Sequence, residues 1–339
     1  METRLTNNSL QRDVIVTWLN KYFLATPFTF ELLPEHASFR RYYRVYSRSD
    51  SYILMLAPAN EKPAEFCLIA DFFQANQLLA PKILAKELSL GLILMTDMGN
   101  KTLLAALKQN LIDEKLAYQN AISILLNLQR LPKQLSLPIF DQQLLNQEWQ
   151  WHQEWFFEKY LQKKIPAPLL GSLNEAYALL VAQATSQSQI FMHRDFHADN
   201  LMLSDKSRIA VLDFQDAFYG PLTYDLVSLL KDCYHKLSPN LLDELCAGYW
   251  QASTVARTKS YAEFRRDFDF MGVQRHIKAL FTFARKCLRD NAWRYAQFMP
   301  LTLDYIVETC SGYPELATMG NVYANLKDQL KELDPRCVE

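Results

Sequence analysis

The sequence lacks most features that mark a secreted, membrane-spanning or nucleic-acid-binding protein. Its six cysteines are scattered without a C-x-x-C pair, which argues against a disulfide scaffold or a zinc site and favours reduced thiols. No uncharged apolar run is long enough for a membrane helix, and the polar N-terminus contains no apolar signal core. A net charge of -1 gives no basis for binding nucleic acid or an anionic membrane. We therefore expect a cytoplasmic protein whose partners are neither nucleic acid nor membrane.

The most informative stretch covers residues 193–225. There, two short apolar runs flank the polar turn 204–207, a pattern typical of a β-hairpin. Because an antiparallel hairpin brings its open ends together, Asn200 before the first strand and Asp213 after the second should be neighbours. Asp195 lies in the loop just upstream. The stretch therefore predicts two carboxylates and an amide at one place.

Those three side chains suit phosphoryl transfer. Asn200 and Asp213 offer the hard oxygen ligands that Mg²⁺ prefers. Asp195 could accept a proton from an attacking hydroxyl and orient it in line with a γ-phosphate. The spacing from Asp195 to Asn200 is that of the protein-kinase loop H-R-D-x-x-x-x-N, and the tripeptide that begins at Asp213 stands where a kinase has Asp-Phe-Gly.

A metallohydrolase is an alternative explanation of the same stretch. Four of its side chains alternate like ligands of a transition metal: His193, Asp195, His197 and Asp199. This alternative leaves Asn200, Asp213 and the hairpin without a role.

The stretch resembles the catalytic core of the aminoglycoside phosphotransferase and choline kinase-like superfamily, which are small-molecule relatives of protein kinases. Their loop has the form H-x-D-x-x-x-x-N, often with a second histidine where His197 stands, so the resemblance implies that His197 and Asp225 support Asp195. A longer run most resembles the bacterial sugar kinases of cell-wall recycling, which phosphorylate the anomeric hydroxyl of N-acetylmuramate and N-acetylglucosamine. That run contains Asp-Phe-Gln-Asp-Ala from Asp213, Tyr-Gly-Pro from Tyr219 and Tyr-Asp-Leu from Tyr224.

The resemblance implies a two-lobed α+β fold like that of protein kinases. A small N-terminal sheet lobe would cover residues 1–98, a mostly helical lobe would cover 99–339, and ATP would bind between them. The hinge at about 95–99 would offer adenine the backbone groups from Thr96 to Met98.

In the same scheme, residues 37–41 form the loop over the ATP phosphates, although they contain no glycine cluster. Ser38 and backbone N–H groups could bind phosphate oxygens, with Arg41 or Arg44 adding positive charge. A solvated basic turn explains each arginine equally well. The third strand has Met55 about where a protein kinase carries its phosphate-binding lysine, so either an arginine from the preceding strands or the metal alone must supply that charge.

Candidates for the acceptor side come from an unusually aromatic helix predicted over residues 141–161. Glu148, Trp151 and Trp155 share one helical face there, where aromatic rings could stack on a sugar and the carboxylate could hold its hydroxyls. An aromatic core stripe is the more common explanation. Asp216, just beyond Asp213, could touch metal, water or substrate.

A basic helix predicted over residues 261–290 supplies the last candidate. Its Arg275 could bind the lactyl carboxylate of a muramic acid, although a solvated helix face is the more common explanation of such a pattern.

The sequence as a whole predicts a monomeric kinase, dependent on ATP and Mg²⁺, that phosphorylates the anomeric hydroxyl of an N-acetyl amino sugar. One alternative within the same fold is an aminoglycoside or choline-type kinase. Another is a nucleotide-binding pseudokinase, which the missing lysine would permit but which the presence of Asp195, Asn200 and Asp213 argues against.

Overall fold

The structure is a computed structural model that describes residues 2–24, 26–34, 39–204, 208–334 and 336. Contacts between Cα atoms divide the chain into two compact units. The first unit contains Met1–Asn100 and Ser204–Asp216, and the second contains Lys101–Leu203 and Ala217–Glu339. This differs from the predicted division at residues 98–99, because 204–216 belongs to the first unit rather than to the helical part. The predicted location of the ATP site stays a prediction.

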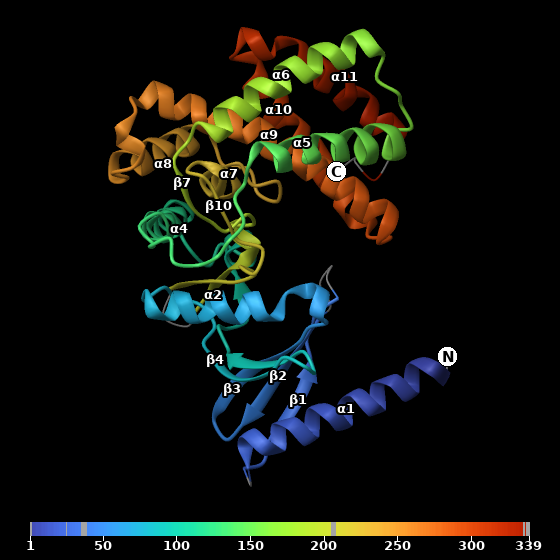
Figure 1. Cartoon of the computed structure of the whole chain (residues 1–339), viewed down its shortest axis with the longest axis vertical. Coiled ribbons are helices and arrows are strands. Elements are labelled where there is room, and N and C mark those ends of the chain that lie inside the picture. Colours follow the sequence, from blue (N-terminus) through green and yellow to red (C-terminus); the bar gives the residue numbers. More distant parts are fainter. Residues whose placement is uncertain (1, 25, 35–38, 205–207, 335, 337–339) are drawn as a thin grey trace. The chain divides into compact units, whose positions relative to one another are not determined.

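The first unit is built on a five-stranded antiparallel sheet in the order β1-β2-β3-β5-β4. Its elements are α1 (Glu2–Phe23), β1 (Thr29–Leu32), β2 (Arg41–Ser47), β3 (Asp50–Leu56), a 3₁₀ turn (Ala59–Glu61), α2 (Pro63–Ala75), β4 (Ile83–Glu87), β5 (Leu92–Thr96) and β9 (Ile209–Val211). Figure 1 shows α1 and α2 on different sides of this sheet.

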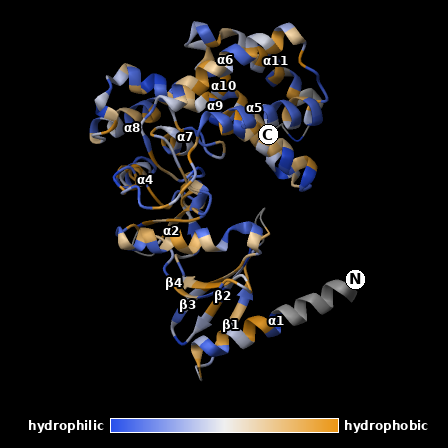
Figure 2. Ribbon diagram, in the orientation of Figure 1, coloured by the Kyte–Doolittle hydropathy of each residue, from blue (hydrophilic) through white to orange (hydrophobic). Residues whose placement is uncertain are grey.

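Alternation along the strands explains how both faces of the sheet are covered. Leu54 of β3 packs in one apolar cluster with Ile15 and Leu19 of α1. Figure 2 shows apolar segments in the part of α1 that lies beside β1. Met55 points to the opposite face, because successive strand residues do, and it is fully buried. The position where a kinase carries its lysine is therefore a core position in this chain.

The second unit is mostly helical. Its longer elements are α3 (Leu103–Lys108), α4 (Glu114–Leu128), α5 (Gln142–His152), α6 (Ala167–Thr185), α7 (Tyr224–Leu230), α8 (Pro239–Ala252), α9 (Tyr261–Arg289), α10 (Met299–Ser311) and α11 (Ala317–Leu333). A π-helix (Gln153–Tyr160) continues α5, and 3₁₀ turns cover Ala198–Asn200, Ala256–Thr258, Trp293–Phe298 and Pro314–Leu316. Short strands complete it: β6 (Lys101–Thr102), β7 (Gln189–Met192), β8 (Leu201–Leu203) and β10 (Phe218–Pro221).

Helix α9 is the central element of the second unit, and it lies among α5, α6, α7 and α10 (Figure 1). A capping box starts it, in which Ser260 accepts from the Glu263 N–H while Glu263 accepts from the Ser260 N–H. Gln274, Arg275 and His276 are buried in its middle. The expectation that this basic stretch is a solvated face is therefore wrong for these residues.

The two strands predicted on either side of residues 204–207 are present as β8 and β9. Within the first unit, the Ser204 N–H donates to the Arg208 carbonyl at 2.8 Å. No disulfide joins the described cysteines. None of the described helices combines the length and the apolar character that a membrane span requires.

Candidate active site

The loop from His193 to Asn200 follows β7, which pairs with β10 in antiparallel register. Asp225, in the first turn of α7, accepts the N–H groups of His193 at 2.6 Å and of Arg194 at 3.0 Å. Arg194 has a φ of 76°, which a non-glycine residue adopts only when its surroundings hold it there. Burial raises the pKa of Asp225 to about 6, although His193 and the two N–H donors oppose that rise. Asp225 thus fixes the backbone of the loop, as the resemblance implied.

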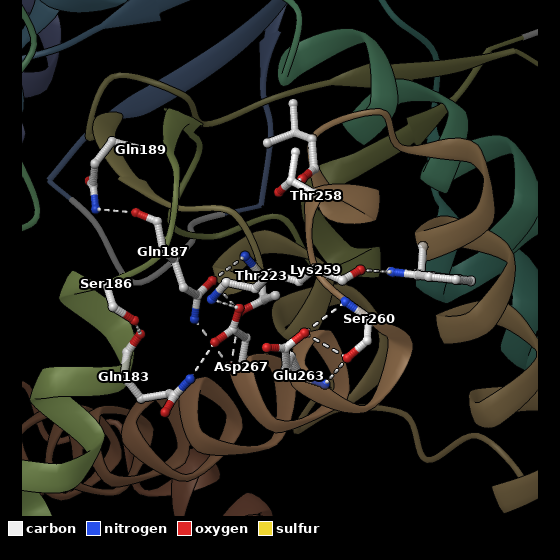
Figure 3. A network of polar contacts seen from close by, with 12 residues as sticks. Gln183, Ser186, Gln187, Gln189, Thr223, Thr258, Lys259, Ser260, Glu263 and Asp267 are labelled. Atoms are coloured by element: carbon white, nitrogen blue, oxygen red, sulfur yellow. Dashed lines mark hydrogen bonds and ion pairs between the residues drawn. The ribbon is translucent and has the colours of Figure 1, made fainter.

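A buried polar network supports the two segments that carry this loop and Asp225 (Figure 3). Gln187, just before β7, accepts the Thr223 N–H at 3.1 Å and donates to the Asp267 carbonyl at 3.3 Å. The Asp267 carboxylate in turn accepts from Lys259 at 2.7 Å. The network therefore anchors the start of β7 and the start of α7 to the same helix, α9.

Asp195, His197 and Asn200 come together in the loop. The Asn200 amide nitrogen lies 3.0 Å from the Asp195 carbonyl oxygen, to which it donates, and 3.4 Å from Nε2 of His197. Burial lowers the pKa of His197 to about 3, so its imidazole is neutral. The structure thus gathers both predicted catalytic residues and one predicted metal ligand within the second unit.

The Asp195 carboxylate keeps access to solvent, with 37% of its side chain exposed. Lys278 of α9 lies 3.4 Å from Oδ1. Burial alone would raise the pKa of Asp195, but the nearby cations, Lys278 first among them, hold that pKa well below its usual range. Asp195 is therefore an ionised carboxylate that can accept a hydrogen bond but is a weak base.

The ligand set of the metallohydrolase alternative does not form. Asp199 instead accepts from the hydroxyl of Thr102, the residue that caps α3. Among the described residues, no three His, Cys, Asp or Glu side chains are placed to hold a metal ion together.

The candidate substrate residues of the second unit lie in different surroundings. Glu148 is 1% exposed and accepts from Arg194 at 3.2 Å and from Gln274 at 2.8 Å. Arg275 is also buried, and its Nε donates to the Ser228 hydroxyl.

Trp155 belongs to the π-helix, whose wider turn alters the face predicted from α-helical spacing. Lys159 lies 3.8 Å from the centroid of the Trp155 ring, whereas Trp151 packs against Phe281 of α9. The structure therefore does not bring Glu148, Trp151 and Trp155 together in one contact network.

In the first unit, Arg40 joins two carboxylates. Its guanidinium lies 2.6 Å from Asp213 and 3.2 Å from Glu61. Arg40 is 8% exposed, whereas the side chain of Asp213 is 41% exposed. Asp213 has a φ of 60°, and the neighbouring Phe214 stacks on Phe66 of α2. The ring of Phe214 thus fixes the segment that carries the exposed carboxylate.

Three further residues predicted to bind the nucleotide lie in the first unit: Arg44, Thr96 and Met98. Arg44 donates to Asp97 at 2.7 Å and to the Gly99 carbonyl at 3.0 Å, so it secures the segment that follows β5. Thr96 ends β5, and its hydroxyl accepts the Lys82 N–H. Met98 lies in the partly exposed loop beyond β5.

Two further predicted residues have clear positions. Arg41 starts β2 opposite Leu56 of β3. Asp216 is 37% exposed and lies 2.5 Å from Lys62, which precedes α2. Ser38 lies outside the described residues.

Comparison with known proteins identifies the family. Residues 29–260, which make up more than half of the chain, match the phosphotransferase enzyme family. The chain therefore belongs to this family, and it is a small-molecule kinase.

Two curated relatives are similar over most of their length. An N-acetylmuramate/N-acetylglucosamine kinase of Pseudomonas aeruginosa is 34% identical over 302 residues, which cover 87% of this chain and 88% of the relative. A kinase of the same name from Neisseria meningitidis serogroup B is 32% identical over 321 residues, which cover 91% and 94%. The predicted membership in the aminoglycoside phosphotransferase and choline kinase superfamily is confirmed.

Solved structures confirm the predicted kinase-like α+β fold. A choline kinase of Streptococcus pneumoniae has a TM-score of 0.59 at 12% identity, covering 85% of this chain and 98% of that chain. An ADP-bound aminoglycoside phosphotransferase has a TM-score of 0.58 at 15% identity, covering 86% and 98%.

Sequence reasoning missed three residues that the structure places at these sites. Arg40 adjoins Arg41 in the predicted phosphate loop, so its basic character was the available signal. Lys278 belonged to a helix face expected to be solvated. Asp232, which accepts the Ala198 N–H at 3.3 Å, carried no signal that sets it apart from an ordinary loop carboxylate.

Proposed function

We propose that this kinase transfers the γ-phosphoryl group of ATP to the anomeric hydroxyl of N-acetylmuramate or N-acetylglucosamine in peptidoglycan recycling. The observation that carries the proposal is the similarity to curated N-acetylmuramate/N-acetylglucosamine kinases, which extends over nearly the whole of both chains. We further propose that the protein works in the cytoplasm as a monomer.

Asp195 orients the acceptor in the proposed reaction. Its carboxylate accepts a hydrogen bond from the anomeric hydroxyl, whose oxygen attacks the γ-phosphorus while the bond from that phosphorus to the β-phosphate oxygen breaks. The hydroxyl proton passes to Asp195 and then to water. An anomeric hydroxyl is more acidic than an ordinary alcohol, so a weak base suffices. The low pKa of Asp195 supports a role that depends on orientation more than on basicity.

His197 and Asn200 keep the proposed base in place. The His197 ring lies 3.4 Å from the Asn200 amide nitrogen, and this amide holds the Asp195 backbone through its carbonyl. The carbonyl oxygen of the Asn200 side chain would bind Mg²⁺, in agreement with the preference of that ion for oxygen ligands.

Asp213 would be the second Mg²⁺ ligand, and its surroundings fit that role. In the part of the chain that the structure describes, both donors to its carboxylate, Arg40 and Gln215, bond to Oδ1. The exposed carboxylate can therefore present Oδ2 to a cation. Bound Mg²⁺ would neutralise charge on the phosphates.

We assign to Arg40 the charge that the absent lysine would supply. Met55, which stands at the position of that lysine, is buried and carries no charge. Arg40 is the nearby cation in the first unit, where it pairs with Glu61 and Asp213. A guanidinium bonds phosphate oxygens with several parallel N–H groups. Ser38 and Arg41 remain proposed phosphate contacts.

The segment after β5 would receive adenine. Thr96 and Met98 would contribute backbone groups, and Arg44 would hold this segment through Asp97 and the Gly99 carbonyl instead of contacting phosphate.

The sugar-side assignments rest on exposure and pairing. We retain Asp216 as a partner of sugar hydroxyls because its carboxylate is accessible. Glu148 and Arg275 are buried, so they would act by fixing Arg194 and Ser228. Trp155 would offer a ring face for stacking.

ATP consumption with a panel of acceptors tests the proposal. The panel contains N-acetylmuramate, N-acetylglucosamine, choline and kanamycin, and phosphorus NMR identifies each product. We expect a sugar 1-phosphate. Phosphate on choline or kanamycin would overturn the proposed substrate, and nucleotide binding without turnover of any acceptor would favour a pseudokinase.

Two variants test the assigned residues. Asp195→Ala should abolish turnover while nucleotide binding survives, and Asp213→Ala should lower kcat by orders of magnitude. Asp199→Asn is the matched control, because Asp199 lies in the same loop but is exposed and contacts Thr102. Unchanged turnover in Asp213→Ala would refute the metal assignment.

A further inference from the structure

Lys278 contacts the proposed base although no feature of the sequence set it apart. Its ammonium lies 3.4 Å from Oδ1 of Asp195, and its side chain is only 16% exposed. Among the described residues, Lys278 is the one side chain that forms a hydrogen bond or ion pair with the Asp195 carboxylate. An amphipathic lysine normally keeps its charged end in water, so this largely buried position requires an electrostatic reason.

The neighbours of Lys278 on α9 explain how it is held there. Gln274, four residues earlier, donates to Glu148 of α5, and Arg275, three residues earlier, donates to Ser228 of α7. Residues three and four apart lie on the same side of a helix. One face of α9 is thus fixed against α5 and α7, and Lys278 extends from that face to the catalytic loop.

The geometry of the contact leaves the carboxylate available. A separation of 3.4 Å is longer than a tight charge-assisted hydrogen bond, which is about 2.7–2.9 Å. Lys278 contacts Oδ1, and 37% of the Asp195 side chain remains exposed. The ammonium can therefore restrain one carboxylate oxygen while the other receives an acceptor hydroxyl.

We propose that Lys278 is a positioning residue for phosphoryl transfer, which holds the Asp195 carboxylate toward the acceptor hydroxyl and offsets its negative charge. This inference rests on the proposed role of Asp195, but not on the identity of the sugar. An ionised carboxylate repels the anionic group that is being transferred, and a cation at Oδ1 reduces that repulsion. Lys278 acts through Asp195, so its loss should lower kcat more than it raises the acceptor KM.

The test measures kcat and the acceptor KM for Lys278→Ala and Lys278→Arg, with whichever acceptor the wild type phosphorylates. We expect kcat of Lys278→Ala to fall on the order of 100-fold, with a KM change of less than about threefold. Lys278→Arg should recover part of kcat. Added ethylammonium should raise kcat of Lys278→Ala, because a small amine can fill the space of the lost side chain.

Lys286→Ala is the matched control on the same helix. Lys286 lies 4.8 Å from the centroid of the Tyr295 ring and is not part of the proposed machinery. Its substitution should leave kcat and KM unchanged. An equal loss of kcat in the two alanine variants would mean that the lysines of α9 act only by stabilising the fold. The inference would then be wrong.

A double variant separates this inference from the proposed role of Asp195. If Lys278 acts through Asp195, Lys278→Ala should cost little further kcat in an Asp195→Asn background, where the carboxylate is lost but the side chain keeps its shape. Full turnover in Asp195→Ala alone would overturn the proposed role of Asp195. Loss of turnover in Asp195→Ala with normal kcat in Lys278→Ala would overturn only the inference about Lys278, as would a loss that neither arginine nor ethylammonium restores.

Discussion

Replacement of Asp225 by asparagine tests how burial and hydrogen bonding compete beneath the candidate catalytic loop. Asp225 is 4% exposed, and both of its carboxylate oxygens accept a backbone N–H. Asparagine keeps the shape but presents an NH₂ group to one of those donors. The Asp225→Asn variant therefore loses at least one bond at any pH, which should cost about 1–3 kcal/mol.

A second effect depends on pH, and its sign follows from the raised pKa. The folded protein binds the Asp225 proton more tightly than the unfolded chain does, because burial raises its pKa from 3.8 to about 6. The stability that this proton gives is complete below pH 4 and is lost as pH rises through 6. The loss approaches about 3 kcal/mol at high pH, of which about 1.4 kcal/mol falls between pH 5 and pH 8.

Urea unfolding of both proteins at several pH values measures this effect. The variant has no proton to lose at residue 225, so the wild-type advantage in unfolding free energy should shrink by about 1.4 kcal/mol from pH 5 to pH 8. Asp232, whose pKa burial also raises to about 6, is present in both proteins and cancels in the difference. An advantage that stays constant or grows over this range would refute the reasoning, because Asp225 would then titrate at or below its usual pKa.

Further substitutions and metal removal give three more predictions. Gly91→Ala should destabilise the fold by at least about 3 kcal/mol, because φ is +68° and a Cβ would lie 2.0 Å from the Ala57 carbonyl oxygen; thermal melting that matches wild type would contradict this. Gly248→Ala is the control, because an added Cβ at this position of α8 meets nothing within 4 Å. It should raise the free energy of unfolding by about 0.5–1 kcal/mol. Met55→Lys should lower the melting temperature without strengthening nucleotide binding, since it buries an ammonium in the core; tighter binding in calorimetry would argue against Arg40 as the substitute. Chelation should abolish turnover and Mg²⁺ should restore it, whereas full activity in excess EDTA would exclude the metal role.

Local sequence signals predicted the parts of the protein that depend on neighbours along the chain. Asp195 and Asn200 lie in one short loop, so their spacing along the chain was enough to predict that they are neighbours. The cap of α3 is equally local, because the Thr102 side chain needs only the Ala105 N–H one turn ahead. The hairpin, the long periodic helices and the family resemblance were accessible for the same reason.

The contacts that only the tertiary structure decided join residues far apart in sequence. Lys278 reaches Asp195 across 83 positions, and Arg40 reaches Asp213 across 173. Helical spacing could show that Arg275 and Lys278 share a face, but not that this face is buried. Such pairings depend on how whole elements pack, because the chemistry of a charged side chain specifies the kind of partner it needs and not its position. The sequence thus determined the reaction class and the candidate reacting groups of this protein, and packing decided which cations lie beside those groups.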